Sequence, residues 1–124
     1  MKLNNTFEVE QNEDTAVLTP MKDLGELEGN ELEGFYETIL DLFECRKVKR
    51  LVVDLRNADY FGSSALGFFV KLWQRVQEHG GEMALCNASQ NAEKVLNVAH
   101  LDTLWPLCRS RSDALLALSD DVGD

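Results

Sequence analysis

Two adjacent serines, Ser63 and Ser64, stand between an apolar run and an amphipathic one. The run Leu51–Leu55 is typical of a buried strand, and the apolar spacing after the serines is typical of a helix. The first N–H groups of a helix lack partners within the helix, and the aligned peptide dipoles make that end positive, so a phosphate is favoured there. Residues 62–65, called the serine turn below, are therefore a candidate phosphorylation site. The alternative is that the hydroxyls only cap the helix.

Two catalytic interpretations of this region fail. The turn approaches the G-x-S-x-G elbow of hydrolases, but its fifth residue is Leu66. His79 on the same helix would lie roughly 20 Å from the serines, at about 1.5 Å per residue. Asp54 at a strand end suggests a receiver aspartate, but the chain lacks the acidic pair and the lysine that a receiver places around it. We therefore expect no enzymatic activity, and we expect Asp54 to accept hydrogen bonds from N–H groups of the next loop.

Cofactor and metal motifs are absent from the sequence. It has no glycine-rich phosphate-binding loop, and its two histidines and three cysteines show no metal-ligand spacing. The cysteines Cys45, Cys86 and Cys108 are odd in number and widely spaced, which favours reduced thiols. We therefore expect no metal and no cofactor, and a small-molecule ligand is not indicated.

The chain is acidic, with 22 Asp and Glu against 12 Lys and Arg and a formal net charge of −10. This charge repels nucleic acid and anionic lipid, and it favours a protein partner with a basic surface. No apolar run reaches the roughly 18 residues of a membrane span, and the first residues do not resemble a secretory signal. We expect a cytoplasmic protein that binds neither nucleic acid nor membranes.

The serine turn must be positioned by the elements around it. Alternating residues predict an N-terminal β-hairpin over 7–10 and 16–19. Phe68 and Val70 flank the apolar stripe of the helix after the serines, so we expect at least one of them to be partly exposed beside the serine turn, where a partner could contact it. The remaining predicted strands are 48–55, 83–86 and 104–108, and the predicted helices are 30–43, 65–78, 89–99 and 110–118.

Strands that alternate with helices in this way predict an α/β fold. We expect a mixed sheet of about five strands with about four α-helices, joined by right-handed crossovers. Because partners of such sheets meet the loops beyond the carboxyl ends of the strands, the serine turn lies on the expected binding edge. The sequence predicts one domain over 1–124, with its core at about 6–118 and an acidic tail at 119–124.

The order of these elements and several short motifs resemble the STAS domain, the family of anti-sigma factor antagonists and sulfate-transporter cytoplasmic domains. The resemblance covers nearly the whole chain and implies a STAS-type mixed sheet. The segments that carry it are Leu51–Leu55, Phe61–Gly67, Gly80-Gly81 before a strand, Asn87, and Val95–Leu101.

The resemblance implies a regulator that binds an anti-sigma factor, often a serine kinase, and releases it when phosphorylated. The family turn reads D-S-S-G and carries the phosphate on its second serine, which matches Ser64; Ser63 is then a cap or a secondary acceptor. Here the family's acidic residue is replaced by glycine and its glycine by alanine. The expected partner-binding residues are Gly62, Ser63, Ser64, Ala65 and Phe68.

Two other functions remain open within the family. The chain is alternatively a STAS protein-binding subunit that is not phosphorylated, in a larger signalling or lipid-transport complex. The third possibility is a nucleotide-binding STAS domain, for which no residue argues.

Overall fold

A computed structural model describes residues 2–3, 7–21, 29–58 and 63–119 of the 124-residue chain. These residues contain one six-stranded sheet in the spatial order β1-β2-β3-β4-β5-β6. The first three strands pair antiparallel, and β3 to β6 pair parallel, which confirms the predicted mixed sheet. The strands are β1 (Lys2–Leu3), β2 (Phe7–Asn12), β3 (Thr15–Pro20), β4 (Arg50–Asp54), β5 (Glu82–Cys86) and β6 (Leu107–Cys108).

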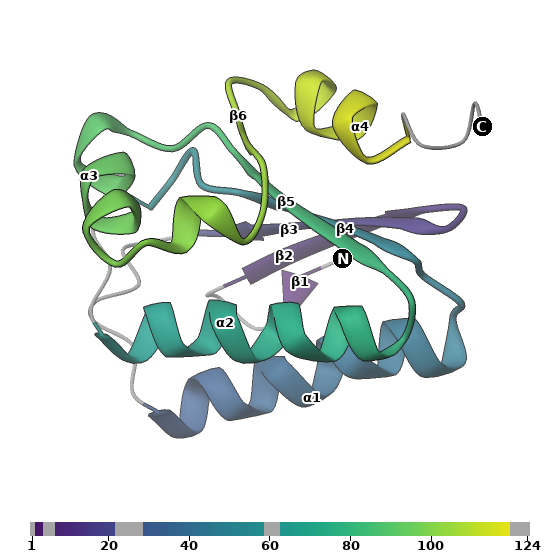
Figure 1. Cartoon of the computed structure of the whole chain (residues 1–124). Helices are drawn as coiled ribbons and strands as arrows, with labels where there is room; N and C mark the ends of the chain where they lie inside the picture. The colour runs from purple at the N-terminus through teal and green to yellow at the C-terminus, as the bar shows by residue number, and fades with distance from the viewer. Residues whose placement is uncertain (1, 4–6, 22–28, 59–62, 120–124) are drawn as a thin grey trace.

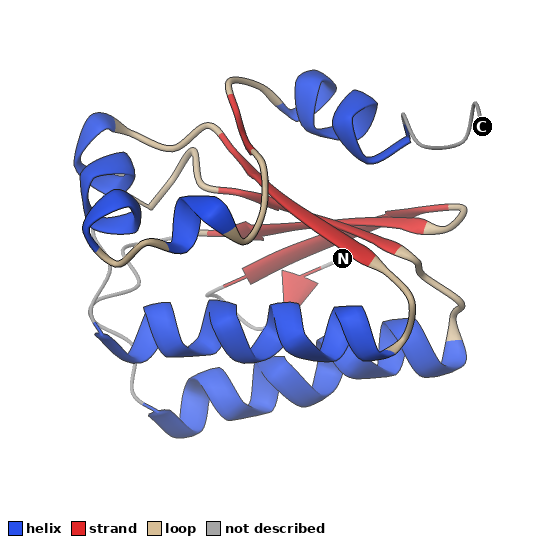
Figure 2. Ribbon diagram, viewed as in Figure 1, coloured by secondary structure: helices blue, strands red, loops and turns tan. Residues whose placement is uncertain are grey.

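Helices cover both faces of this sheet, as Figures 1 and 2 show. The two long helices, α1 (Gly29–Cys45) and α2 (Ser63–Glu78), lie on one face, and α4 (Arg111–Ser119) lies on the other. The short helix α3 (Gln90–Val98) and the 3-10 helix η2 (Leu101–Thr103) connect β5 to β6 beside the start of α2. The described residues thus contain the four α-helices that the sequence predicted, none of which is long and apolar enough to cross a membrane.

The hairpin of β2 and β3 confirms the N-terminal prediction. Its register pairs Val9 with Leu18 and closes through a two-residue loop, in which Glu13 adopts a left-handed φ of 57°. The strand predicted over 104–108 is shorter in the structure, because Leu104 and Trp105 form a turn and a bend and only Leu107–Cys108 pair with β5. The edge strand β1 was not predicted, since two residues carry no readable alternation.

Strand β4 is buried on both faces, which explains its continuous apolar run. Successive side chains of a strand point to opposite faces, so Leu51 and Val53 pack into the core beneath α1 and α2, and Val52 packs into a smaller cluster beneath α4. The main core also holds Phe7, Leu18, Ile39, Phe69, Leu72 and Leu85, and the smaller cluster holds Val17, Ala84, Cys86, Ala114 and Leu118. This two-sided packing fixes the carboxyl end of β4, from which the chain runs to the serine turn.

Gly81 fixes the connection from α2 back to the sheet. A Cβ atom at this position would lie 2.6 Å from the carbonyl oxygen of Lys49 and 3.0 Å from the Phe43 ring. Real Cβ atoms do not approach backbone that closely, so only glycine fits without a backbone shift. The preceding Gly80 has φ 75°, which ends the helix in a left-handed conformation.

Candidate functional site

Helix α2 begins at Ser63, so both serines lie in the first turn of a 16-residue helix. The helix starts beyond the carboxyl end of β4, on the edge where the sequence analysis placed the binding site. Its first turn contains no acidic residue, so no carboxylate of that turn neutralises the positive end of the helix dipole. Gly62 lies outside the described residues, and at Ser63, Ser64 and Ala65 the structure describes the backbone. The phosphorylation of Ser64 or Ser63 therefore stays a prediction.

The expectation that Phe68 is an exposed partner contact is wrong in this structure. Its side chain is 5% exposed and belongs to the main core. The Phe68 ring packs against Phe7 of β2 and Phe69 of the same helix, with centroid distances of 6.2 and 5.7 Å. Helix α2 packs against both the sheet and α1, so its buried stripe is wider than a single row of apolar positions indicates. Val70, the other candidate, is half-buried, which confirms that at least one of the two is partly exposed.

Asp54, the last residue of β4, is fully buried at the edge that carries the serine turn. Its carboxylate accepts a hydrogen bond from the backbone N–H of Arg56 at 3.1 Å, as the sequence predicted. It also accepts bonds from the Arg56 guanidinium at 2.6 and 3.0 Å, from Asn87 Nδ2 at 2.9 Å and from Arg111 at 3.1 and 3.3 Å. We call Asp54, Arg56, Asn87 and Arg111 the Asp54 cluster.

Electrostatics keep Asp54 ionised. Burial alone would raise the pKa of its carboxyl group, but the hydrogen bonds from Arg56, Asn87 and Arg111 outweigh burial and lower the pKa below its usual value. A buried carboxylate with these donors has no lone pair left facing solvent for substrate or metal. The cluster is therefore structural in character rather than a catalytic acid or a phosphate acceptor.

The Asp54 cluster joins four segments at the binding edge of the sheet. Arg56 belongs to the loop that leads to α2, Asn87 follows β5, and Arg111 begins α4. Arg111 also reaches Glu10 on β2 at 3.0 Å. The left-handed φ of 59° at Asn87 suits asparagine, which tolerates this conformation better than most residues. The cluster thus holds the start of the β4–α2 loop relative to both faces of the sheet.

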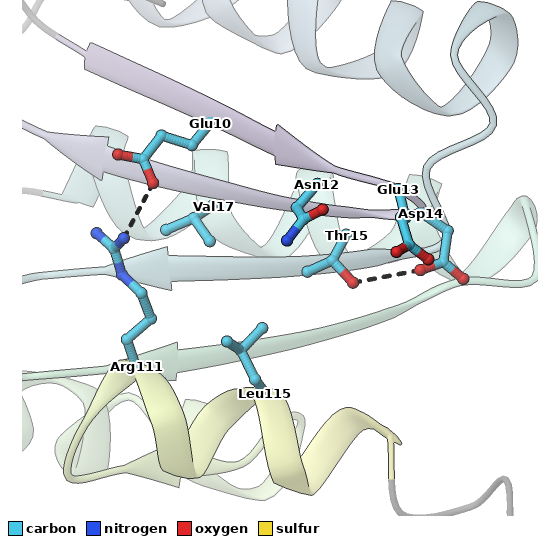
Figure 3. Close-up of a pocket in the computed structure, with 8 residues that line it drawn as sticks. All are labelled: Glu10, Asn12, Glu13, Asp14, Thr15, Val17, Arg111 and Leu115. Atoms are coloured by element: carbon cyan, nitrogen blue, oxygen red, sulfur yellow. Dashed lines mark hydrogen bonds and ion pairs between the residues drawn. The ribbon is translucent and has the colours of Figure 1, made fainter.

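A polar groove lies between the β2–β3 hairpin and α4, on the face opposite α2 (Figure 3). Its volume is about 360 Å³, and Val17 and Leu115 provide its apolar contacts. Figure 3 shows Arg111 directed at Glu10, and Asp14 at the turn of the hairpin, where it also pairs with Arg50 at 3.0 Å. Two of its carboxylates are thus already paired with arginines, and no three metal-ligating side chains gather anywhere among the described residues.

The thiols are free but not activated. Burial, followed by the charge of Asp54, raises the pKa of Cys86 to about 12. Burial also raises the pKa of Cys108, and a hydrogen bond with Asp41 raises that of exposed Cys45. Because the thiolate is the reactive form, these three residues do not provide a cysteine nucleophile.

Comparison with known proteins identifies a family. The sequence model of the STAS domain matches residues 6–114. The "anti-sigma F factor antagonist" of Paenibacillus polymyxa is 26% identical over 78 residues, which are 63% of this chain and 67% of that protein.

Two solved structures share the fold. An anti-sigma-factor antagonist (STAS) domain protein from Planctomyces limnophilus is 29% identical, with a TM-score of 0.76 over 92% of this chain and 98% of that chain. The Bacillus cell fate determinant SpoIIAA in its phosphorylated form is 19% identical, with a TM-score of 0.68 over 94% of this chain and 99% of that chain. At that identity the second likeness shows the fold alone.

Proposed function

This chain belongs to the STAS domain family, and we propose that it is an anti-sigma factor antagonist that phosphorylation of Ser64 switches off. Its partner is an anti-sigma factor that is also a serine kinase, and the kinase supplies ATP. The observation that carries the proposal is the position of the two serines, in the first turn of a long helix at the carboxyl edge of parallel strands. The names of the Paenibacillus and Planctomyces relatives support the partner class.

Phosphorylation changes the charge of the binding surface without changing the fold. The Ser64 hydroxyl oxygen bonds to the γ-phosphorus of the kinase's ATP, ADP leaves, and the hydroxyl proton passes to the kinase. The phosphate adds about −1.5 to −2 charges, which the N–H groups and dipole of α2 stabilise locally. The same charge repels acidic groups of the bound anti-sigma factor, so the complex separates by repulsion at the interface.

The Asp54 cluster supports this switch from beneath the surface. It anchors the start of the β4–α2 loop through Arg56, and Ala58 in the same loop donates its N–H to the carbonyl oxygen of Leu55 at 3.1 Å. Both Leu55 and Ala58 are buried. The described start of this loop, up to Ala58, is thus fixed to the sheet, which suits docking of a partner at this edge without a large rearrangement.

One observation favours the second candidate function. The family's acidic residue before the serines is Gly62 here, so the carboxylate that would stand beside the acceptor hydroxyl is missing. A STAS subunit that binds its partner without being phosphorylated has no need for that carboxylate. This alternative keeps the same binding edge and removes the switch.

A charge substitution separates the two functions. The proteins are wild type, Ser64→Asp and, as control, Ser112→Asp, which adds the same charge to the first turn of α4 at an exposed serine. Each is titrated against the purified serine-kinase anti-sigma factors of the source organism. We expect Ser64→Asp to bind roughly tenfold more weakly or worse, because like charges across an interface are costly, and Ser112→Asp to bind as wild type does. Wild-type affinity of Ser64→Asp would contradict the switch.

A further inference from the structure

A shallow apolar depression lies between the first turn of α2 and helix α3. Its volume is about 320 Å³, and its lining residues are Leu66, Lys94, Val95, Val98 and Ala99. Figure 1 shows α3 beside the end of α2 that carries the serines. We call this surface the α2–α3 patch. It contains no residue of the Asp54 cluster and shares no lining residue with the polar groove.

The exposure of Val98 is unusual for this molecule. Its side chain is 80% exposed, the highest value among the exposed large hydrophobic residues of the described chain. Helix α3 already buries Ala92 and Leu96 in the core. Val95 is three residues before Val98 and four before Ala99, so these side chains form a second apolar row next to the buried one. Val95 is half-buried against the main core, whereas Val98 and Ala99 are exposed, so the end of this row faces solvent.

The charge of the patch differs from that of the molecule as a whole. Among the residues that the structure describes, Lys94 is the one charged residue that lines the patch and no carboxylate does, whereas the chain carries a net charge of −10. Covering a carboxylate with a partner would require desolvating a charge, which is costly without a paired cation. The patch can therefore be covered at low cost, and Lys94 at its rim favours an acidic side chain of the partner.

The patch is continuous with the serine turn through one helical turn. Leu66 lines the patch and lies three residues after Ser63, a spacing that places two residues on neighbouring parts of one helix face. A partner that contacts the start of α2 therefore reaches Leu66 and, beside it, Val98. A phosphate at the serine turn would stand next to this apolar contact and keep it hydrated.

We propose that the α2–α3 patch is the hydrophobic centre of the partner-binding surface and receives an apolar side chain of the anti-sigma factor, with an acidic side chain of that partner beside Lys94. This inference rests on the proposed function. The patch takes the place that the sequence analysis gave to Phe68, which the structure buries. Interfaces concentrate their affinity in a few central residues surrounded by a polar rim, and Val98 is the most accessible candidate for that centre.

The test compares two exposed hydrophobic residues on different faces of the molecule. Val98→Ser removes the central contact, and the control Leu116→Ser makes a similar change on α4, where Leu116 is 67% exposed. Because both side chains are largely exposed, both variants should keep the urea unfolding midpoint of wild type. Binding to the same panel of purified serine-kinase anti-sigma factors is measured by calorimetry. We expect Val98→Ser to bind roughly tenfold more weakly and Leu116→Ser to bind within about twofold of wild type.

The outcomes separate this inference from the proposed function. If wild type binds an anti-sigma factor and Val98→Ser binds it equally well, the patch is not the centre of the interface, and the proposed function stands. If Leu116→Ser loses as much affinity as Val98→Ser, the contact does not lie on α3, and the inference also fails. If wild type binds no anti-sigma factor of the panel, both the function and the inference are wrong.

Discussion

Removal of the Asp54 carboxylate should destabilise the whole domain. In Asp54→Ala, the side chains of Arg56, Asn87 and Arg111 lose their shared acceptor. Deleting one partner of a buried ion pair costs about 3–5 kcal/mol of unfolding free energy. Here Arg56 and Arg111 are 52% and 29% exposed, so water can solvate both guanidinium groups after the substitution. We therefore expect a loss near the lower end, about 3 kcal/mol.

A second aspartate provides the matched control. Asp14 pairs with Arg50 at 3.0 Å at the far end of the same sheet, but its side chain is 42% exposed. Exposed ion pairs contribute at most about 1 kcal/mol, so Asp14→Ala should be close to neutral. Both variants remove an aspartate that binds an arginine, so the contrast between them measures the combined effect of burial and of the additional donors at Asp54.

Urea unfolding followed by tryptophan fluorescence measures this contrast. Trp105 is 3% exposed in the fold and should report its loss. For a denaturant slope of about 2 kcal/mol per M, a loss of about 3 kcal/mol lowers the midpoint by about 1.5 M. Equal midpoints for Asp54→Ala and Asp14→Ala would refute the conclusion that the buried cluster holds the binding edge together.

Two further predictions concern the pH dependence of the Asp54 contribution and the close approach at Gly81. Because the pKa of Asp54 is lowered in the folded state, its contribution to stability is complete above its unfolded pKa of about 3.9 and is lost as the pH falls through the lower folded pKa. Because the unfolded pKa is about 3.9, the difference in urea midpoint between wild type and Asp54→Ala should be constant from about pH 5 to about pH 7 and should shrink below about pH 4. A difference that grows on acidification would contradict this prediction. Gly81→Ala should cost about 1–3 kcal/mol because its Cβ would meet the Lys49 carbonyl oxygen. Gly34→Ala, whose Cβ meets nothing within 4 Å, should be neutral or slightly stabilising, and similar melting temperatures for the two alanine variants would show that the close approach at Gly81 does not matter.

Several elements of the fold could be predicted from patterns of neighbouring residues. The hairpin, strand β4 and helix α2 follow from alternation, from continuous apolar residues and from helical spacing. The serine caps of the last two helices were also readable: Ser89 Oγ accepts the N–H of Ala92 at 3.0 Å, and Ser110 Oγ accepts that of Asp113 at 3.1 Å. These features involve residues within a few positions of each other.

Features that depend on distant residues could not be predicted in this way. Arg111 binds Asp54 across 57 positions of sequence and Glu10 across 101, and no spacing rule connects them. Phe68 of α2 packs against Phe7 of β2, which lies far earlier in the sequence, so no local pattern indicates that this side chain is buried. The α2–α3 patch left a partial signal, since Val98 stands three residues after Val95, but the sequence does not show which row of a short helix faces the core.

Whether Ser64 is phosphorylated in the source cells tests the proposed switch most directly. Phosphopeptide mass spectrometry should compare growing with stressed cultures and resolve Ser63 from Ser64. We expect phosphate on Ser64 in a proportion that changes between the two conditions. A well-covered peptide without phosphate in either condition would contradict the switch and favour a STAS subunit that binds its partner constitutively.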